Sequence, residues 1–207
     1  MSQSLLEAMN TAGRGNKRKQ ASRQRLIEAA RNLFVARGYH ATRPQDISKS
    51  AGLGHGTFYL HFKDKQECFT AFVEQARAEV DAAVIERASK STNLSELVEA
   101  VLLAIYDYSE ANPGVLLTVM SDEAVISADN AEGGTLLQRW GEQWGEVLKM
   151  QAKQGLVARD FDFAVIGQAI VGAIHQASSF SYQRGRTRNA LVKALTQFIV
   201  RGLTPTK

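Results

Sequence analysis

The stretch TRPQDISKSAGLGHGTFYLHFKDK, from Thr42 to Lys65, decides the fold, and its first part predicts a short helix. Ile47 and Ala51 are four residues apart, so they face one side of that helix. Thr42 is expected to cap its N-terminus with the side-chain oxygen. Pro44 suits the first turn, where a missing N–H group costs little.

A glycine turn and a second short helix follow. Gly52 is expected to end the first helix, because glycine adopts positive φ without a steric penalty. The second helix is expected from about Gly54 to Leu60, a length that is unstable without packing against a neighbour. Two helices joined by a tight glycine turn form a helix-turn-helix, whose second helix typically enters the major groove of DNA. The stretch therefore predicts a DNA-reading element.

The residues AGLGHGTFYLHFKDK, Ala51 to Lys65, resemble the signature of the TetR family of one-component transcriptional regulators. That signature reads roughly A-G-hydrophobic-S-x-G-T-x-Y-x-Y/H-F-x-x-K and covers only the DNA-binding domain. The sequence departs from it at Gly54, where serine is preferred, and at Pro44, where a small aliphatic residue is usual. The resemblance implies an all-α fold, with an N-terminal three-helix helix-turn-helix domain and a larger helical C-terminal domain for ligand binding and dimerisation.

The first turn of the second helix is the expected centre of DNA contact. Its free N–H groups and positive dipole end suit a phosphate. His55 projects from this turn and is a candidate to hydrogen-bond a base edge. The turn consists of Gly54, His55, Gly56 and Thr57.

The resemblance implies further contacts. Thr57 and Tyr59 match family positions that contact the DNA backbone, and Tyr59 is also expected near a thymine methyl group. Thr42, His61 and Lys65 match positions that hold phosphates. A local hydrogen bond at the helix end is the competing explanation for His61. The two remaining aromatic residues of the motif are expected in the core rather than on DNA: Phe58 and Phe62.

The charge of the chain is unevenly distributed. Residues 1–65 contain 12 Lys and Arg against 4 Asp and Glu, a net charge of +8, whereas residues 66–207 contain 13 against 17, a net charge of −4. A basic N-terminal third beside an acidic remainder indicates that only the first part meets a polyanion such as double-stranded DNA.

Other features of the composition exclude several classes of protein. No apolar run reaches the length of a membrane span, and the N-terminus lacks the apolar region of a secretory signal. A single cysteine, Cys68, excludes an internal disulfide, so a cytoplasmic protein without a membrane partner is expected. Hydrolase, metalloprotease and P-loop motifs are absent, and we expect no catalytic residue, cofactor or metal. Asp122 and Glu123 lack a nearby histidine and are interpreted as solvated.

The sequence predicts three segments: a flexible basic arm over residues 1–20, the helix-turn-helix domain over 21–66, and the effector-binding and dimerisation domain over 67–207. The first helix is expected from Ser22 to Ala36. The arm either adds DNA contacts or remains a solvated tail; its three basic residues are Lys17, Arg18 and Lys19.

The C-terminal segment has the 3.6-residue apolar period of helices. A helix from Asp64 to Ala88 is expected to connect the two domains. Gly141 and Gly145 indicate a close approach by either a neighbouring helix or a ligand, with the helix favoured. Gly167 and Gly172 are expected to allow a similar approach. The last two helices, from about Phe163 to Tyr182 and Asn189 to Leu203, are expected to be buried against some partner, and the resemblance implies that this partner is a second copy.

The resemblance also implies a small-molecule effector that reduces operator affinity by shifting the population of the dimer's states. The notable alternative is a DNA-binding regulator without an effector, controlled by a protein partner, for which a fully packed C-terminal core is expected. His175 is either a buried, satisfied histidine or a ligand contact. The candidate pocket lining is Leu103, Tyr106, Met120, Trp140, Trp144, His175 and Phe180.

Overall fold

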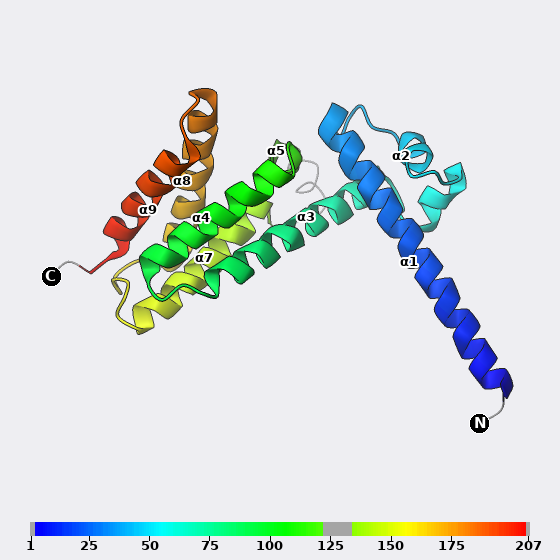
Figure 1. Ribbon diagram of the computed structural model, residues 1–207, viewed down its shortest axis with the longest axis horizontal. Coiled ribbons are helices and arrows are strands. Elements are labelled where there is room, and N and C mark those ends of the chain that lie inside the picture. Colours follow the sequence, from blue (N-terminus) through cyan, green and yellow to red (C-terminus); the bar gives the residue numbers. More distant parts are fainter. Residues whose placement is uncertain (1–2, 122–133, 206–207) are drawn as a thin grey trace. The chain divides into compact units, whose positions relative to one another are not determined.

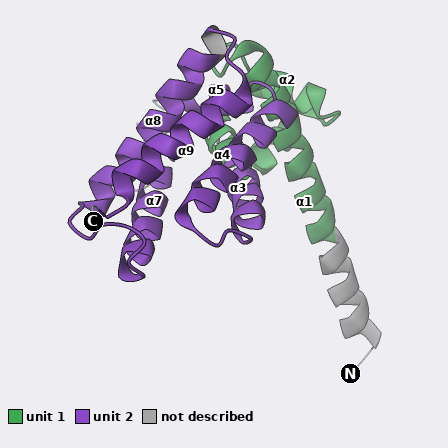
Figure 2. Cartoon of the chain, turned by 60° about the vertical axis from the view of Figure 1, so that its left-hand side comes forward, with its two compact units in different colours: residues 1–75 green, residues 76–207 purple. Residues whose placement is uncertain are grey.

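The computed structural model describes residues 3–121 and 134–205, with side chains from residue 15 onward except at 182 and 183. These residues form helices joined by short loops, and the described part of the chain contains no strand (Figure 1). The all-α prediction is therefore confirmed. The chain divides into two compact units, residues 1–75 and 76–207 (Figure 2).

Unit 1 contains helix α1 (Gln3–Arg37), helix α2 (Pro44–Ser50), the 3₁₀-helix η1 (His55–Leu60) and the start of helix α3 (Lys65–Ala88). Large apolar side chains from all four elements are buried together. The ring of Phe34 on α1 meets the edge of Phe69 on α3, with 5.1 Å between their centroids. The other fully buried large side chains of this core are Leu26, Ile47, Phe58, Phe62 and Phe72.

The first helix begins earlier than the sequence predicted, at Gln3 rather than Ser22. Ser22 is not an N-cap, because its hydroxyl donates to the carbonyl oxygen of Lys19 in the preceding turn, at 2.9 Å. Gly13 and Gly15 lie inside the helix, where each costs about 1 kcal/mol relative to alanine. The backbone of the predicted arm is thus helical from Gln3 onward.

Unit 2 continues α3 and adds five described helices: α4 (Leu94–Ala111), α5 (Val115–Ser121), α7 (Leu136–Lys153), α8 (Phe163–Gln183) and α9 (Arg188–Leu203). Side-chain caps fix several of their starts. Asn93 accepts from the backbone N–H of Glu96, and Thr135 forms a capping box with Gln138. Asp122 and Glu123 lie outside the described residues.

Helices α7 and α8 pack with their backbones almost in contact. A Cβ atom built on Gly167 of α8 would lie 2.0 Å from the carbonyl oxygen of Gly141 on α7, and one on Gly145 would lie 2.8 Å from the carbonyl oxygen of Phe163. The interpretation that a neighbouring helix approaches Gly141 and Gly145 is confirmed. Within the described chain nothing lies within 4 Å of the Cβ position of Gly172, so the same expectation for Gly172 stays a prediction.

Helix α8 is an apolar helix that the rest of the described chain covers only in part. Over Phe163–Ser181 it has the length and mean hydropathy of a membrane span, although only 22% of that window is buried. One such helix is weak evidence for a membrane protein. Together with α9 it exposes large apolar side chains, including Val165 at 60% and Phe198 at 67% of their accessible surface.

Candidate DNA-binding surface and ligand cavity

The turn between α2 and η1 is held by glycine and by a hydrogen bond from an arginine of α1. Gly52 has a φ of +64°, as the sequence predicted, and ends α2 immediately after Ala51. Arg25 on α1 donates from Nη2 to the carbonyl oxygen of Ala51 at 2.6 Å. Gly54 then adopts an extended conformation and caps η1 through its backbone. This turn therefore fixes the start of η1 against α1.

Thr42 has a structural position that the sequence did not predict. Helix α2 begins after Arg43, whose side chain makes no cap, so Thr42 is not the N-cap residue. The side chain of Thr42 is fully buried, and its hydroxyl donates to the carbonyl oxygen of Gly38 at 2.8 Å. The predicted N-cap role of Thr42 was therefore wrong, whereas its DNA contact stays a prediction that requires the hydroxyl to change its partner.

The exposed face of η1 carries three side chains suited to base or backbone contact. The rings of His55 and Tyr59 meet edge to face, with 6.0 Å between their centroids. Tyr59 is 52% exposed and Leu60 is 71% exposed. Leu60 was missed by the sequence reasoning, which assigned the apolar positions of the motif to the core. An exposed leucine at the end of a reading helix is suited to apolar contact with a thymine methyl group.

The aromatic residues Phe58 and Phe62 lie in the core, as the sequence predicted. Both are essentially inaccessible to solvent, and their ring centroids are 5.5 Å apart. Arg23 places its guanidinium group over the Phe62 ring, 5.1 Å from its centroid. These rings anchor the inner side of η1, which leaves the outer side free of core contacts.

His61 and Lys65 are engaged within unit 1. The Nε2 atom of His61 lies 2.7 Å from the Ser22 hydroxyl oxygen. Partial burial, together with the positive charges of Lys19 and Arg23, lowers the pKa of His61 below its usual value. Lys65 donates to the carbonyl oxygen of Tyr39 at 2.8 Å.

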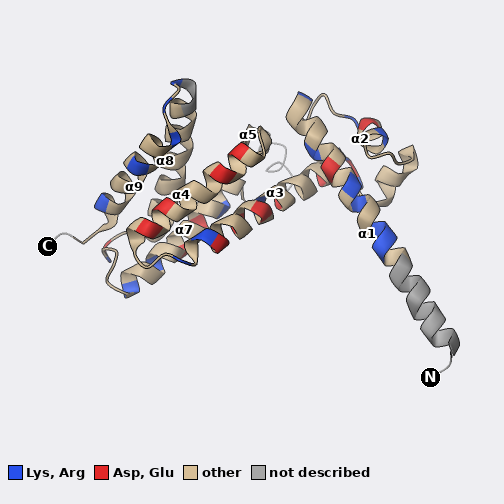
Figure 3. Cartoon of the chain, viewed as in Figure 1, with Lys and Arg blue, Asp and Glu red and all other residues tan. Residues whose placement is uncertain are grey.

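Basic side chains recur along the described part of α1 (Figure 3). Lys17, Arg18 and Lys19 are all exposed and lie near the middle of this helix. Glu28 is the first acidic residue among the described side chains of α1, which begin at residue 15. The surface of α1 around these three residues is accordingly electropositive.

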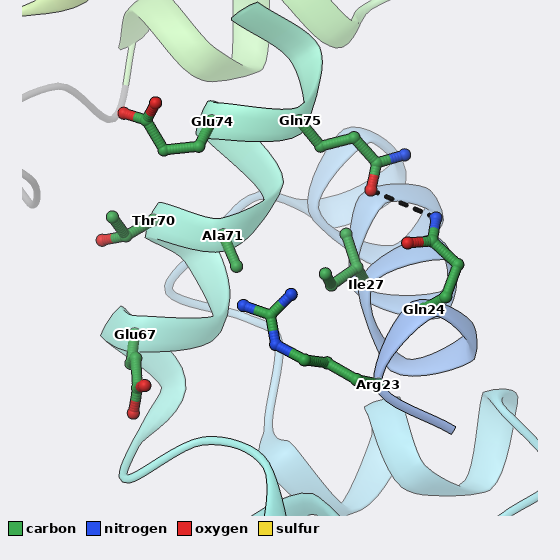
Figure 4. A pocket seen from close by; sticks show the side chains of 8 residues that line it. All are labelled: Arg23, Gln24, Ile27, Glu67, Thr70, Ala71, Glu74 and Gln75. Atoms are coloured by element: carbon green, nitrogen blue, oxygen red, sulfur yellow. Dashed lines mark hydrogen bonds between the residues drawn. The ribbon is translucent and has the colours of Figure 1, made fainter. Parts of the chain in front are cut away.

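A small groove of about 420 Å³ lies between α1 and α3 within unit 1. In Figure 4 the Arg23 side chain extends from α1 toward α3, and Gln24 donates to Gln75 across the groove at 3.2 Å. Glu67 and Glu74 line the opposite side. The lining is largely polar and open, so the groove is a contact region between two helices rather than a site for an apolar ligand.

Unit 2 contains a much larger cavity, of about 1650 Å³, lined by residues of α3, α4, α5, α7, α8 and α9. Five of the predicted lining residues face it: Tyr106, Met120, Trp140, Trp144 and His175. Most of the other lining side chains are apolar, and α3 contributes its second half. A cavity of this size exceeds the usual range for small-molecule sites.

Two predicted lining residues lie elsewhere. Leu103 packs against the apolar core of unit 2 instead of the cavity. Phe180 is 46% exposed, and the guanidinium groups of Arg184 and Arg186 lie 5.5 Å and 5.9 Å from its ring centroid. Both were assigned from apolar character alone, which does not distinguish a cavity wall from core or surface.

Polar contacts inside the cavity are few and specific. The hydroxyl groups of Tyr106 on α4 and Ser178 on α8 are 2.7 Å apart. Trp140 on α7 donates from Nε1 to the Asp81 carboxylate on α3 at 3.3 Å. The described residues include no cluster of three or more His, Cys, Asp or Glu side chains placed to hold a metal ion.

Comparisons with known proteins agree with this geometry. Residues 26–72 match the family model described as bacterial regulatory proteins of the tetR family. The chain is 23% identical to the uncharacterized HTH-type transcriptional regulator YdgC of Bacillus subtilis, over 89% of this chain and 93% of that protein. It is 30% identical to the TetC protein of transposon Tn10 from Escherichia coli, over 67% of this chain and 70% of TetC.

Among solved structures, the fatty acid degradation regulator FadR from Bacillus halodurans shares the fold with a TM-score of 0.71 and 18% identity. The likeness covers 86% of this chain and 94% of FadR. The helix-turn-helix geometry, the family match and the extended similarity to TetC lead to one assignment. This chain belongs to the TetR family of bacterial DNA-binding transcriptional regulators.

Proposed function

We propose that the protein is a cytoplasmic repressor that binds a palindromic DNA operator as a homodimer and is released by a small molecule held in the cavity of unit 2. The observation that carries the proposal is the course of α3. Its first residues hold Phe69 and Phe72 in the core of unit 1, against Phe34 of α1, and its later residues line the cavity. A ligand that moves α3 in unit 2 therefore acts on an element that is packed into the core of the DNA-binding unit.

The proposed DNA contacts centre on η1. His55 and Tyr59 share its exposed face, and Leu60 extends that face. The backbone N–H groups of His55 and Gly56, which follow the N-cap Gly54, are suited to a phosphate. The Thr57 N–H already donates to the Gly54 carbonyl oxygen at 2.9 Å, so the contact proposed for Thr57 is made by its side chain. We add Lys17, Arg18 and Lys19 of α1 as phosphate contacts, because all three are exposed cations.

His61 and Lys65 are proposed to act on DNA only through a change of partner. Lys65 would have to leave both the Tyr39 carbonyl and the face of the Tyr39 ring, 4.1 Å from its centroid. His61 would have to exchange the Ser22 hydroxyl for a phosphate oxygen. Their role in positioning α1, η1 and α3 is therefore at least as important to the proposed surface as direct contact.

The proposed dimer interface consists of the exposed faces of α8 and α9. These faces combine large apolar side chains with small ones, including Val165 and Ala169 on α8 and Ala194 and Phe198 on α9. Small residues allow helices of two copies to approach closely, and the apolar rings supply area for burial. A twofold dimer matches two half-sites about one helical turn of DNA apart.

An effector-free regulator controlled by a protein partner remains the second hypothesis. It predicts a fully packed core in unit 2. The cavity of about 1650 Å³ favours the effector-gated function instead. We also propose that the protein has no catalytic activity, since its family consists of regulators.

The first test is selection of bound sequences from a random pool of double-stranded DNA, followed by binding titrations on the enriched sequence. A palindrome is expected. His55→Ala should weaken binding about fivefold or more, because one base contact is worth about 1 kcal/mol. His40→Ala, which changes another exposed histidine of unit 1, is the matched control. Equal losses from both variants, or no enriched sequence, would contradict the proposed reading surface.

The dimer has a separate test. Phe198→Asp places a charge on the proposed interface and should convert the dimer to monomer in sedimentation experiments, with operator affinity falling as a result. Met150→Asp changes another exposed apolar residue, on α7, and should leave the dimer intact. A Phe198→Asp variant that remains dimeric would show that the interface lies elsewhere.

A further inference from the structure

The charged side chains that line the cavity of unit 2 balance one another. Four arginines and four carboxylates contribute to the lining, which gives no net charge. Several of these groups are paired within the protein: Arg188 donates to Glu110 at 3.0 Å and also pairs with Asp107 beside the cavity. The lining charges are Arg77, Arg139, Arg186 and Arg188 against Asp81, Glu110, Glu142 and Glu146.

A charged ligand would gain little from such a lining. Burying an ionised group without an opposite charge is costly, and Arg77 or Arg188 would have to leave a carboxylate partner before it could bind a ligand carboxylate. An uncharged ligand meets no such cost and can bury its surface against the apolar part of the lining, which includes Trp140 and Trp144. The charge balance therefore favours a neutral, largely apolar ligand.

The hydrogen bond between Tyr106 and Ser178 determines whether a ligand at Tyr106 must donate or accept a hydrogen bond. The Ser178 hydroxyl donates its single proton to the carbonyl oxygen of Ile174 at 2.6 Å. The 2.7 Å contact between Tyr106 and Ser178 must then use the Tyr106 proton, with the Ser178 oxygen as acceptor. Both protons are committed, so the Tyr106 oxygen offers the cavity lone pairs and no proton.

The protonation state of Tyr106 is stable at neutral pH. Burial raises the pKa of its phenol above the usual value, so the group remains neutral. The indole N–H of Trp140 is committed as well, to the Asp81 carboxylate at 3.3 Å. The Tyr106 oxygen is thus a neutral acceptor set in a mostly apolar wall. The Tyr106 oxygen can therefore accept a hydrogen bond from a ligand that carries an O–H or N–H group.

We propose that the cavity binds an uncharged, largely apolar molecule that carries a hydroxyl or N–H group and donates it to the Tyr106 oxygen. This inference rests on the proposed function only in taking the cavity as the ligand site. It adds the chemical class of the ligand and names Tyr106 as the residue that selects it, with Ser178 as the residue that orients Tyr106.

The probes are 1-decanol, its isomer methyl nonyl ether, and decanoate. The two isomers have the same heavy-atom count, but only the alcohol can donate a hydrogen bond, and decanoate adds a negative charge. Binding is read from tryptophan fluorescence of the full chain, since its two tryptophans, Trp140 and Trp144, both line the cavity. The alcohol should bind about three- to tenfold more tightly than the ether, the usual worth of one neutral hydrogen bond.

Two variants test whether the preference for the alcohol comes from its hydrogen bond to Tyr106 or from the shape of the cavity. Tyr106→Phe should remove the preference by lowering the affinity for the alcohol, while the affinity for the ether stays the same. Ser178→Ala frees the Tyr106 proton, which the ether oxygen can then accept. This variant should remove the preference by raising the affinity for the ether. Ser179→Ala, which removes a neighbouring hydroxyl of the lining, is the matched control and should leave the ratio unchanged. Circular dichroism establishes that each variant folds.

Three outcomes would overturn the inference: tighter binding of decanoate than of both neutral isomers, a wild-type preference for the ether, or no fluorescence response to any probe. A preference that survives Tyr106→Phe would overturn the assignment of that residue. The proposed function is tested separately, by adding the bound alcohol to the protein–operator complex. An alcohol that binds with the expected preference but leaves the operator bound supports the ligand class and contradicts effector gating.

Discussion

The contact between α7 and α8 makes a sharp prediction for alanine at position 167. Alanine is favoured over glycine inside a helix by about 1 kcal/mol, so the substitution would stabilise an open site. At Gly167, however, the new Cβ atom would lie 2.0 Å from the Gly141 carbonyl oxygen and 2.7 Å from the Gly145 nitrogen. Both are backbone atoms of α7, and neither can rotate away.

The magnitude follows from these distances. Real Cβ atoms stay beyond about 3.0 Å from such neighbours, so the helices must separate locally by 3.0 − 2.0, or about 1 Å. Overpacking of this kind costs about 1–3 kcal/mol, and a gap of 1 Å forfeits up to half of each dispersion contact. We take the upper end, because the obstacle is backbone, and subtract the propensity gain. Gly167→Ala should therefore lower the free energy of unfolding of unit 2 by about 2 kcal/mol.

Urea unfolding followed by tryptophan fluorescence measures this directly, because Trp140 and Trp144 both lie on α7. With an m-value of about 2 kcal/mol per molar urea, the midpoint should fall by about 1 M. Gly172→Ala on the same helix meets nothing within 4 Å and should raise the midpoint by up to about 0.5 M. Because Gly172 lies on the proposed dimer face, both variants are compared at several protein concentrations. Equal shifts for the two variants, or a higher midpoint for Gly167→Ala than for Gly172→Ala, would refute the reasoning.

Three further predictions concern other sites. Burial raises the pKa of the Cys68 thiol from 9.0 to about 12, so the unfolded chain releases its proton at a lower pH than the folded chain. The free energy of unfolding should therefore fall as pH rises from about 9 to about 12. At pH 8 a thiol reagent should label Cys68 only through transient opening, far more slowly than in the unfolded chain, and fast labelling of the folded protein would contradict its burial. Gly52→Ala should destabilise unit 1 by about 1–2 kcal/mol in thermal unfolding followed by circular dichroism, because its φ is +64°, and Gly52→Asn should cost less; equal costs would argue against strain. Thr135→Ala removes the capping box with Gln138 and should cost about 1 kcal/mol in urea unfolding, a loss that Gln138→Ala should reproduce only in part.

Local patterns predicted much of the fold because their causes are local. The spacing of Phe58 and Phe62 placed both rings in the core, and Gly52 supplied the positive φ that its turn requires. The start of α1 was missed because Gly13 and Gly15 read as a break, whereas a long helix tolerates both at a modest cost. Composition alone does not show whether a helix ends at such glycines or continues through them.

The candidate sites were predicted less completely, because they depend on contacts between distant residues. The bond between His61 and Ser22 joins positions 39 residues apart, and the bond from Lys65 to Tyr39 joins positions 26 apart. Neither spacing has a signature in the sequence. The same applies to the cavity: Tyr106 was one of the predicted lining residues, but its hydrogen-bond partner, Ser178, lies 72 residues away.

The helical course of α1 has a consequence for how its basic residues meet DNA. Successive residues of an α-helix are about 100° apart around its axis. Lys17, Arg18 and Lys19 therefore span about 200°, and a single phosphate strand can face at most two of them at once. A pliable tail would gather all three charges and lose conformational freedom on binding. A preformed helix makes one phosphate contact fewer than such a tail but avoids that entropy loss. The salt dependence of operator affinity should therefore correspond to about one fewer released counterion per subunit.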